Sequence, residues 1–169
     1  MIVLITGGQR SGKSRYAEQM ALELSPNPVY IATAHVGDEE MAERVRRHRR
    51  RRGGQWTNYE EERRISRFDI EGRVAVVDCL TLWCSNFMYD GGREATVDDA
   101  LSAAKEEFDR MARKDATLIF VTNEIGSGGV SPNAVQRRFT DLQGWMNQYV
   151  AERADKVILM VCGIPVTIK

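Results

Sequence analysis

Residues 7–14 read GGQRSGKS, and this stretch decides the fold. It follows a short apolar run at 2–6 and precedes an amphipathic pattern at 13–24, so it connects a buried strand to a helix. The spacing G-x-x-x-x-G-K-S in that setting predicts a phosphate-binding loop, because the glycines let backbone N–H groups curve around an anion. The helix adds the positive end of its dipole. We expect Lys13 to reach the β- and γ-phosphates of a nucleotide; the alternative is an ordinary glycine turn before a helix.

The rest of the chain alternates short apolar runs with longer helical patterns. Strands are predicted at 2–6, 29–33, 74–78, 117–122 and 156–162, and helices at 13–24, 38–51, 80–88, 97–113 and 132–153. Ser131 before Pro132 predicts the start of the last helix. Such βα units favour an α/β fold, a RecA-like P-loop NTPase with a mainly parallel sheet and helices on both faces. Gly163, between two apolar runs, predicts an antiparallel C-terminal edge strand.

Length and composition are those of one soluble domain, residues 1–169. The chain has 24 basic and 24 acidic residues, so net charge points to no partner class. The apolar N-terminal run is too short for a signal peptide, and no run reaches membrane-spanning length. We therefore expect a cytoplasmic protein without membrane insertion. Cys79, Cys84 and Cys162 form no C-x-x-C pair and are expected to be reduced thiols.

Two oxygen ligands for Mg²⁺ are predicted next to the phosphate loop. The Ser14 hydroxyl follows the loop lysine, as in other phosphate loops. Asp78 ends the apolar run at 74–78 and is the natural second ligand, since it is expected at a strand end of the same sheet. The alternative for Asp78 is a cap for the helix that starts near Leu80.

The phosphate loop leaves the reaction open. No N-K-x-D segment follows a later strand, where VTNEIG stands instead, which disfavours a regulatory GTPase. Residues 44–52 hold seven arginines in nine positions and favour either a small-molecule kinase with an arginine-rich lid or a nucleic-acid ATPase. Acidic residues on both sides of this arginine run weaken its long-range field, so nucleic acid is the less favoured partner.

His48 interrupts the arginine run and needs its own explanation. On a helix, it shares a stripe with Met41 and Val45, so it is expected to face the protein. One interpretation is a half-buried histidine bonded to a backbone carbonyl. The other is catalytic: neighbouring guanidinium groups disfavour a second positive charge, and a neutral imidazole can attack phosphorus while the arginines stabilise the departing pyrophosphate. His35 is assigned no catalytic role.

The order and spacing of several motifs resemble one family nearly end to end. These motifs are ITGGQRSGKSRYAE, YIATA, DEEMAERVRRHR, VVDCLT, VTNEIGSG and GIPVTIK. They resemble the bifunctional adenosylcobinamide kinase / adenosylcobinamide-phosphate guanylyltransferase family of cobalamin biosynthesis. The resemblance implies a homotrimer that phosphorylates adenosylcobinamide with ATP or GTP. It then transfers GMP from GTP to adenosylcobinamide phosphate through a guanylylated histidine, here His48, and yields adenosylcobinamide-GDP.

The resemblance also implies a nucleotide site, in which His48 and Lys13 are catalytic. Its members are Gly7, Gly8, Gln9, Arg10, Ser11, Gly12, Lys13, Ser14, Ala32, Thr33, Ala34, Arg49, Arg50, Arg51, Arg52, Glu60 and Asp78. Glu60 lies in a variable stretch, and no single arginine of the four receives a role. A carboxylate such as Glu124 or Asp78 is a candidate to assist the substrate alcohol. Leu82, Trp83, Phe87, Met88 and Trp145 either fill the core or contribute to the trimer contact.

Overall fold

The computed structural model describes residues 1–35, 39, 43, 46, 52–90 and 93–169. Its centre is a seven-stranded sheet in the order β3-β2-β4-β7-β1-β8-β9, parallel throughout except for the last pair. The strands are β1 (Ile2–Gly7), β2 (Val29–Ala32), β3 (Thr57–Glu60), β4 (Val74–Asp78), β7 (Thr117–Val121), β8 (Lys156–Val161) and β9 (Ile164–Thr167). The predicted α/β fold with a parallel sheet and an antiparallel edge strand is confirmed.

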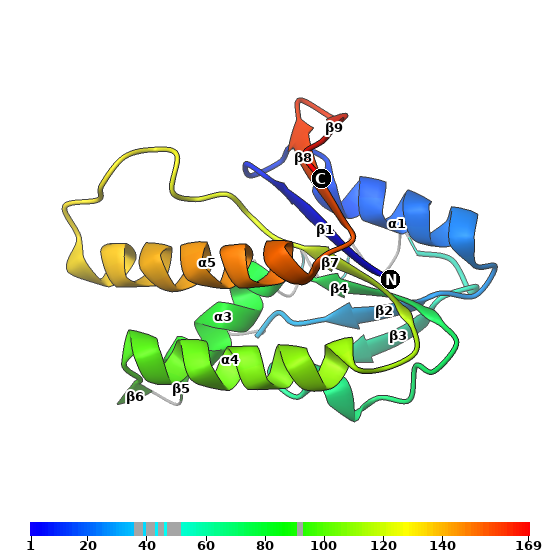
Figure 1. Ribbon diagram of the computed structural model, residues 1–169, viewed down its shortest axis with the longest axis horizontal. Coiled ribbons are helices and arrows are strands. Elements are labelled where there is room, and N and C mark those ends of the chain that lie inside the picture. The colour runs from blue at the N-terminus through cyan, green and yellow to red at the C-terminus, as the bar shows by residue number, and fades with distance from the viewer. Residues whose placement is uncertain (36–38, 40–42, 44–45, 47–51, 91–92) are drawn as a thin grey trace.

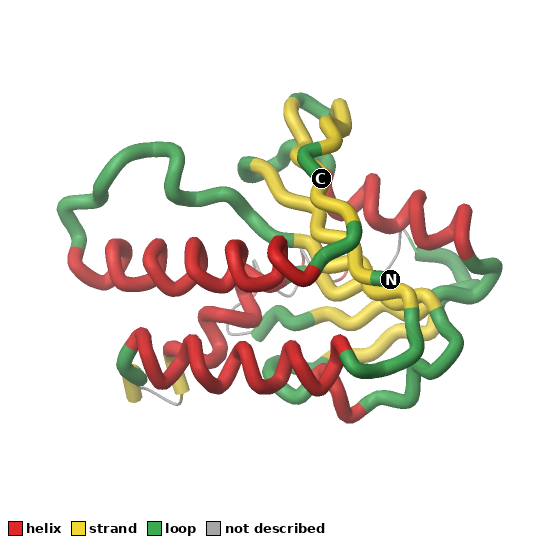
Figure 2. The backbone as a smooth tube through the Cα atoms, viewed as in Figure 1, coloured by secondary structure: helices red, strands yellow, loops and turns green. Residues whose placement is uncertain are grey.

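Helices cover both faces of the sheet (Figures 1 and 2). The helices are α1 (Lys13–Leu24), α3 (Leu80–Met88), α4 (Val97–Ala112) and α5 (Ala134–Arg153). On one face, Ala17 of α1 packs with Val3, whereas on the other Phe108 of α4 packs with Leu4. Adjacent residues of β1 thus serve opposite cores, which explains why the strand is an unbroken apolar run. In the described part of the chain, no helix combines the length and apolar character needed to cross a membrane.

Most element boundaries agree closely with the sequence prediction. The helices predicted at 13–24 and 80–88 coincide with α1 and α3, and the strand predicted at 74–78 coincides with β4. The other predicted strands differ by one residue at their C-terminal ends. Most of the helix predicted at 38–51 lies outside the described residues. Glu39, Glu43 and Arg46 are described and helical, and Arg46 bonds both carboxylates, at 2.6 and 2.9 Å.

Three local features differ from the prediction. The last helix is capped by Asn133, whose Oδ1 accepts from Val135 N at 2.8 Å, because its amide oxygen reaches the first free N–H groups. Ser131, the predicted cap, instead accepts from Asn133 N at 3.2 Å in the preceding turn. A small antiparallel pair that was not predicted, β5 (Tyr89–Asp90) and β6 (Arg93–Glu94), follows α3. The third, β3, is an edge strand whose TNYE sequence has no apolar run.

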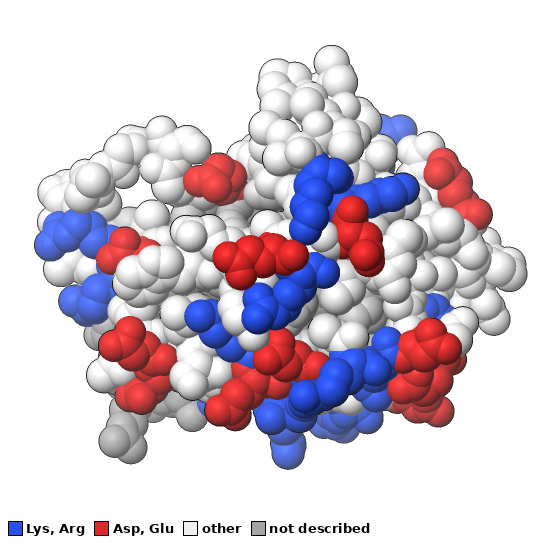
Figure 3. All heavy atoms as spheres, in the orientation of Figure 1, with Lys and Arg blue, Asp and Glu red and all other residues white. Residues whose placement is uncertain are grey.

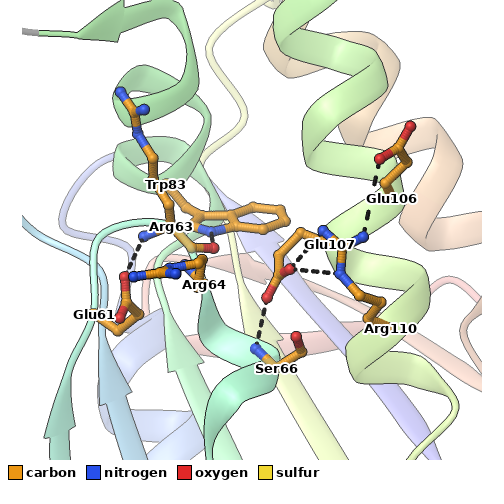
Figure 4. A network of polar contacts seen from close by, with 8 residues as sticks. All are labelled: Glu61, Arg63, Arg64, Ser66, Trp83, Glu106, Glu107 and Arg110. Atoms are coloured by element: carbon orange, nitrogen blue, oxygen red, sulfur yellow. Dashed lines mark hydrogen bonds and ion pairs between the residues drawn. The ribbon is translucent and has the colours of Figure 1, made fainter.

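A salt-bridged carboxylate ties the segment after β3 to α4 (Figure 4). Glu107 of α4 is 3% exposed, accepts from Ser66 N at 2.7 Å, and pairs with Arg110 at 2.9 Å. Ser66 lies in the short 3-10 helix η1 (Ile65–Arg67). Nearby, the buried Trp83 donates its indole N–H to Arg63 O at 2.9 Å. These bonds fix the connection that leads from β3 into β4 and therefore into the edge of the sheet where the site lies.

Replacing Glu107 by alanine is expected to lower the free energy of unfolding by about 2–3 kcal/mol, because the Ser66 N–H then loses its acceptor and Arg110 its buried partner. Glu106 is the matched control, since it lies beside Glu107 and contacts the same Arg110 at 3.9 Å, but is 69% exposed. Glu106→Ala should cost less than about 0.5 kcal/mol. Urea unfolding curves measure both values, and equal losses would contradict the assigned role of Glu107.

Candidate active site

The carboxyl ends of the central strands meet at one edge of the sheet. β7 lies between β1 and β4, with Val121 in register with both Ile5 and Asp78. On the next strand, Ala32 is in register with Asp78. The phosphate loop after β1 and the carboxylate of β4 are therefore neighbours across a single intervening strand. Glu124 N, beyond β7, donates to Gly7 O at 3.0 Å and joins a third segment to this edge.

The phosphate loop is packed against the C-terminal hairpin. Gly7 has a φ of +147°, and a Cβ there would lie 2.5 Å from Met160 O of β8. Gly12 has a φ of +98°, and its missing Cβ would lie 3.4 Å from Gly163 Cα in the hairpin turn. Gly163 N donates to Ser11 O at 3.0 Å. The two glycines are thus required both for the turn itself and for the close approach of the hairpin.

Gly7→Ala should lower the free energy of unfolding by about 2 kcal/mol or more, because the backbone at Met160 must move and the positive φ is strained. Gly8 provides the matched control in the same loop, since no atom lies within 4 Å of its missing Cβ. Gly8→Ala should change stability by less than about 1 kcal/mol. Thermal unfolding monitored by circular dichroism compares the two variants. A Gly8 variant that is the less stable of the pair would refute this account of the loop.

Lys13 begins α1 and points back to the loop. Its side chain is buried, with 7% exposed, and Nζ donates to Gly8 O at 2.7 Å. Burial lowers the pKa of Lys13, while nearby Cys79 and Asp78 act in the opposite direction. An anion bound in the loop would add favourable charge to this buried ammonium.

Asp78 ends β4, and its surroundings fix its position. Its Oδ2 accepts from the Tyr30 hydroxyl at 2.7 Å. The adjacent Cys79 exchanges two bonds with Thr33: Cys79 N donates to Thr33 Oγ1 at 2.8 Å, and Thr33 Oγ1 donates to Cys79 O at 2.7 Å. Cys79, not Asp78, caps α3, and its Sγ accepts from Leu82 N at 3.5 Å. The Asp78 carboxylate is therefore not used as a helix cap.

Two neighbouring acids remain neutral around Asp78. Burial raises the pKa of the Cys79 thiol to about 12, and the nearby Asp78 carboxylate adds to this effect. Burial also raises the pKa of Tyr30 well above its usual range, with Asp78 again contributing. A protonated Tyr30 hydroxyl is a donor to Asp78 at neutral pH.

A cavity of about 610 Å³ opens between these elements. Its lining residues are Gln9, Arg10, Ser11, Gly12, Lys13, Ser14, Arg15, Tyr30, Ala32, Ala34, Arg52, Asp78, Cys79, Leu82, Val121, Asn123, Glu124 and Ile125. Most predicted nucleotide-site residues that the structure describes are in this set. The size fits a small-molecule ligand, and the lining combines a glycine loop, several cationic groups and two carboxylates, Asp78 and Glu124.

Several predicted residues do not line the cavity. Gly7 and Gly8 form the base of the loop, and Thr33 is fully buried with its hydroxyl bonded to Cys79. Glu60 is exposed at the end of β3, in register with Ala32. Thr33 therefore contributes through the backbone that it holds. His48, Arg49, Arg50 and Arg51 lie outside the described residues.

Arg52 is the one member of the arginine run with a described place at the cavity. Its side chain is 5% exposed, and its guanidinium carbon lies 3.5 Å from the centre of the Tyr30 ring. Nε donates to Asn58 Oδ1 at 2.9 Å, and Nη1 lies 3.8 Å from Glu18 Oε1. Tyr30 was missed by sequence reasoning. The sequence signal for Tyr30 was its position two residues before Ala32, since residues at this spacing lie on the same face of a strand.

The donor set at the cavity fits Mg²⁺. Ser14 and Asp78 both line it and offer hydroxyl and carboxylate oxygens, the ligands that this cation prefers. Among the residues that the structure describes, no group of three His, Cys, Asp or Glu side chains could hold a metal ion. Magnesium in nucleotide enzymes needs only one or two protein oxygens, because phosphates and water complete its shell.

The first strand of this parallel sheet leads into a glycine loop, and the nearby strand β4 supplies the carboxylate of Asp78. This arrangement defines the class of P-loop nucleotide-binding proteins. Solved structures share this fold. One solved ATPase domain has a TM-score of 0.50 at 14% identity, covering 94% of this chain and 68% of that one. An ATPase from the type III secretion system of pathogenic bacteria has a TM-score of 0.51 at 12% identity, covering 98% and 56%.

The chain belongs to the family described as cobinamide kinase / cobinamide phosphate guanyltransferase, whose profile matches residues 3–168. The bifunctional adenosylcobalamin biosynthesis protein CobP of Pseudomonas aeruginosa is 39% identical over 177 residues, 98% of this chain and 96% of that protein. The bifunctional adenosylcobalamin biosynthesis protein CobU of Escherichia coli is 35% identical over 182 residues and the full length of both. The resemblance inferred from the sequence motifs is confirmed.

Proposed function

We propose that this protein is a bifunctional enzyme of cobalamin biosynthesis. It phosphorylates adenosylcobinamide with ATP or GTP, and then transfers GMP from GTP to adenosylcobinamide phosphate to give adenosylcobinamide-GDP. The observation that carries this proposal is the family match over residues 3–168. The cavity beside the phosphate loop supports it, because it joins Lys13 to the Asp78 carboxylate in one space.

The kinase step uses the described residues directly. Lys13 stabilises negative charge on the transferring γ-phosphoryl group, and the loop amides hold the remaining phosphates. Mg²⁺, held by Ser14 and Asp78, would neutralise phosphate charge when bound. Glu124 lines the cavity, and its Oε1 accepts from Gly126 N at 2.7 Å. This fixed carboxylate is the better candidate to take the proton of the substrate hydroxyl, since Asp78 already accepts from Tyr30.

The guanylyltransferase step uses His48. Its imidazole nitrogen attacks the α-phosphorus of GTP, pyrophosphate leaves, and GMP is held through a P–N bond. An oxygen of adenosylcobinamide phosphate then attacks the same phosphorus, and the imidazole departs. The arginines at 49–52 stabilise the charge on the phosphates during both displacements. Arg52 supports this assignment, because its guanidinium lies at the cavity that contains the phosphate loop.

The enzyme acts in the cytoplasm as a homotrimer in this proposal. Exposed apolar side chains on the C-terminal hairpin, with Ile164 65% and Ile168 60% exposed, offer surface for a second copy. Trp145 of α5 is 46% exposed, whereas Trp83 and Met88 are core residues. Light scattering should give three times the chain mass of 19.1 kDa. A monomer at micromolar concentration would refute the trimer.

Nucleic acid is not a partner in this proposal. On the face shown in Figure 3, basic and acidic side chains are interleaved, and no charged side chain is seen at the tip of the β8–β9 hairpin at the top. Such a surface produces no extended positive field. RNA or DNA binding with steep salt dependence would count against the proposal.

Mass spectrometry tests the function as a whole. After incubation with GTP and Mg²⁺, the peptide that contains residue 48 should carry one GMP, and addition of adenosylcobinamide phosphate should remove it. Phosphorylation of adenosylcobinamide without such an adduct would instead identify a kinase with an arginine-rich lid and no guanylyltransferase step. Absence of both products would refute the proposal.

A further inference from the structure

Tyr30 contacts two residues of the candidate site at once. It lies within β2 with 3% of its surface exposed, and its hydroxyl donates to Asp78 Oδ2 at 2.7 Å. The face of its ring lies under the Arg52 guanidinium at 3.5 Å. Trp56 supports the ring from the side, with an interplanar angle of 80°. A single side chain therefore connects the carboxylate of β4 with the arginine run.

The hydroxyl of Tyr30 restricts the carboxylate of Asp78. One carboxylate oxygen, Oδ2, is held by the bond, so the group cannot rotate freely and Oδ1 keeps one orientation. Bonds of this kind to the ligands of a metal raise its affinity, because the ligand geometry exists before the metal binds. The backbone on the other side of Asp78 is held independently, since Thr33 N donates to Asp78 O at 3.2 Å.

The ring of Tyr30 positions a buried cationic donor. Arg52 Nη1 is buried without a hydrogen-bond partner among the described residues, and Glu18 Oε1 at 3.8 Å is too distant for one. The Glu18 carboxylate at this distance compensates the guanidinium charge only partly, which favours an anionic ligand where Arg52 meets the cavity. A phosphate is the matching ligand at this place, because Arg52 lines the same cavity as the phosphate loop.

We propose that Tyr30 is a positioning residue of the nucleotide site, acting through two separate contacts. Its hydroxyl orients Asp78 toward the divalent cation of the bound nucleotide, and its ring holds Arg52 as a donor to a phosphate of the same nucleotide. The inference rests on the proposed function only for the identity of the ligand, a nucleoside triphosphate with a divalent cation.

Four variants separate the two contacts. Tyr30→Phe removes the hydroxyl and keeps the ring, Tyr30→Leu removes both, and Arg52→Met removes the charge and keeps much of the side-chain volume. Tyr59→Phe is the matched control, because Tyr59 is a tyrosine of the adjacent strand β3 that stacks on Phe68 at 4.0 Å and does not line the cavity. Thermal unfolding of each variant verifies that it is folded.

Two binding measurements serve as readouts on the whole protein. The affinity for a fluorescent, non-hydrolysable GTP analogue is measured in EDTA, and the affinity for Mn²⁺ in the nucleotide complex is measured by electron paramagnetic resonance. Tyr30→Phe should weaken Mn²⁺ binding about 10-fold and leave metal-free nucleotide binding within about twofold. Arg52→Met should weaken metal-free nucleotide binding about 10-fold, and Tyr30→Leu should show both losses.

Normal Mn²⁺ binding by a folded Tyr30→Phe protein would overturn the role of the hydroxyl. Normal metal-free nucleotide affinity in a folded Arg52→Met or Tyr30→Leu protein would overturn the role of the ring. Neither measurement involves a corrinoid or the GMP adduct. Failure of this inference is therefore distinguishable from failure of the proposed function.

Discussion

Replacing His48 by alanine should abolish covalent labelling of the protein by GTP that carries a label on the α-phosphate. Transfer of GMP to adenosylcobinamide phosphate should fall by at least about 10³-fold, because the covalent route loses its nucleophile. Phosphorylation of adenosylcobinamide should stay within about threefold of wild type, since the γ-phosphoryl group passes directly to the alcohol. Acid-labile radioactivity on the purified protein and the rates of the two half-reactions are the measurements.

The matched control for this prediction is His35→Ala. His35 is exposed, and its Nδ1 lies 2.8 Å from Glu62 Oε1, in a surface pair with no role in the proposed chemistry. This variant should retain full labelling. Acid-labile label on the His48→Ala protein would show that another residue receives GMP. An equal loss of both half-reactions in that variant would show a structural role for His48 instead.

The fold could be predicted because central parallel strands are buried on both faces. Such strands are continuous apolar runs, so β4 and the strands around it are visible in the sequence. β3 gives no such signal, since it is an edge strand with Asn58 and Glu60 exposed. Asn133 was missed as a cap because Ser131 and Pro132 form a signal of the same kind, and only the backbone path decides between them.

The parts of the candidate site that a local sequence motif defines could be predicted. The parts that depend on contacts between distant residues could not. The glycine loop, Lys13 and Asp78 follow from the residues next to single strands. The contact of Tyr30 with Arg52 joins positions that are separated by the whole intervening segment, and no periodicity predicts which arginine stacks on which ring. Spacing could only have placed Tyr30 on the same face as Ala32.

The two described arginines of the run at 44–52 have different surroundings, which composition could not reveal. Arg46 is exposed and paired with Glu39 and Glu43, whereas Arg52 is buried at the cavity against Tyr30. A uniform phosphate-binding strip would leave such arginines exposed and unpaired for an extended ligand. Of the two described members, one instead forms local ion pairs and the other lies at the cavity beside the phosphate loop.

Lys13→Ala should reduce kcat/KM of the kinase step by about 10³-fold. The ammonium lies at the loop through its bond to Gly8 O at 2.7 Å and is largely shielded from water, so its attraction to a γ-phosphate is stronger than that of a solvated lysine. Part of the loss should appear in kcat, because charge on the transferring group grows in the transition state. Initial rates of adenosylcobinamide phosphorylation, at varied ATP and GTP, separate kcat from KM.

The control for Lys13 must remove a lysine without touching the loop. Lys156 is exposed at the start of β8, the strand that packs against the loop farther along, so Lys156→Ala should keep both constants within about twofold of wild type. Lys13→Arg keeps the charge but places a larger planar group in a buried space, and should recover little of the rate. A folded Lys13→Ala protein that phosphorylates at more than about a tenth of the wild-type rate would place the kinase reaction elsewhere. The glycine loop would then serve GTP binding for the guanylyl transfer alone.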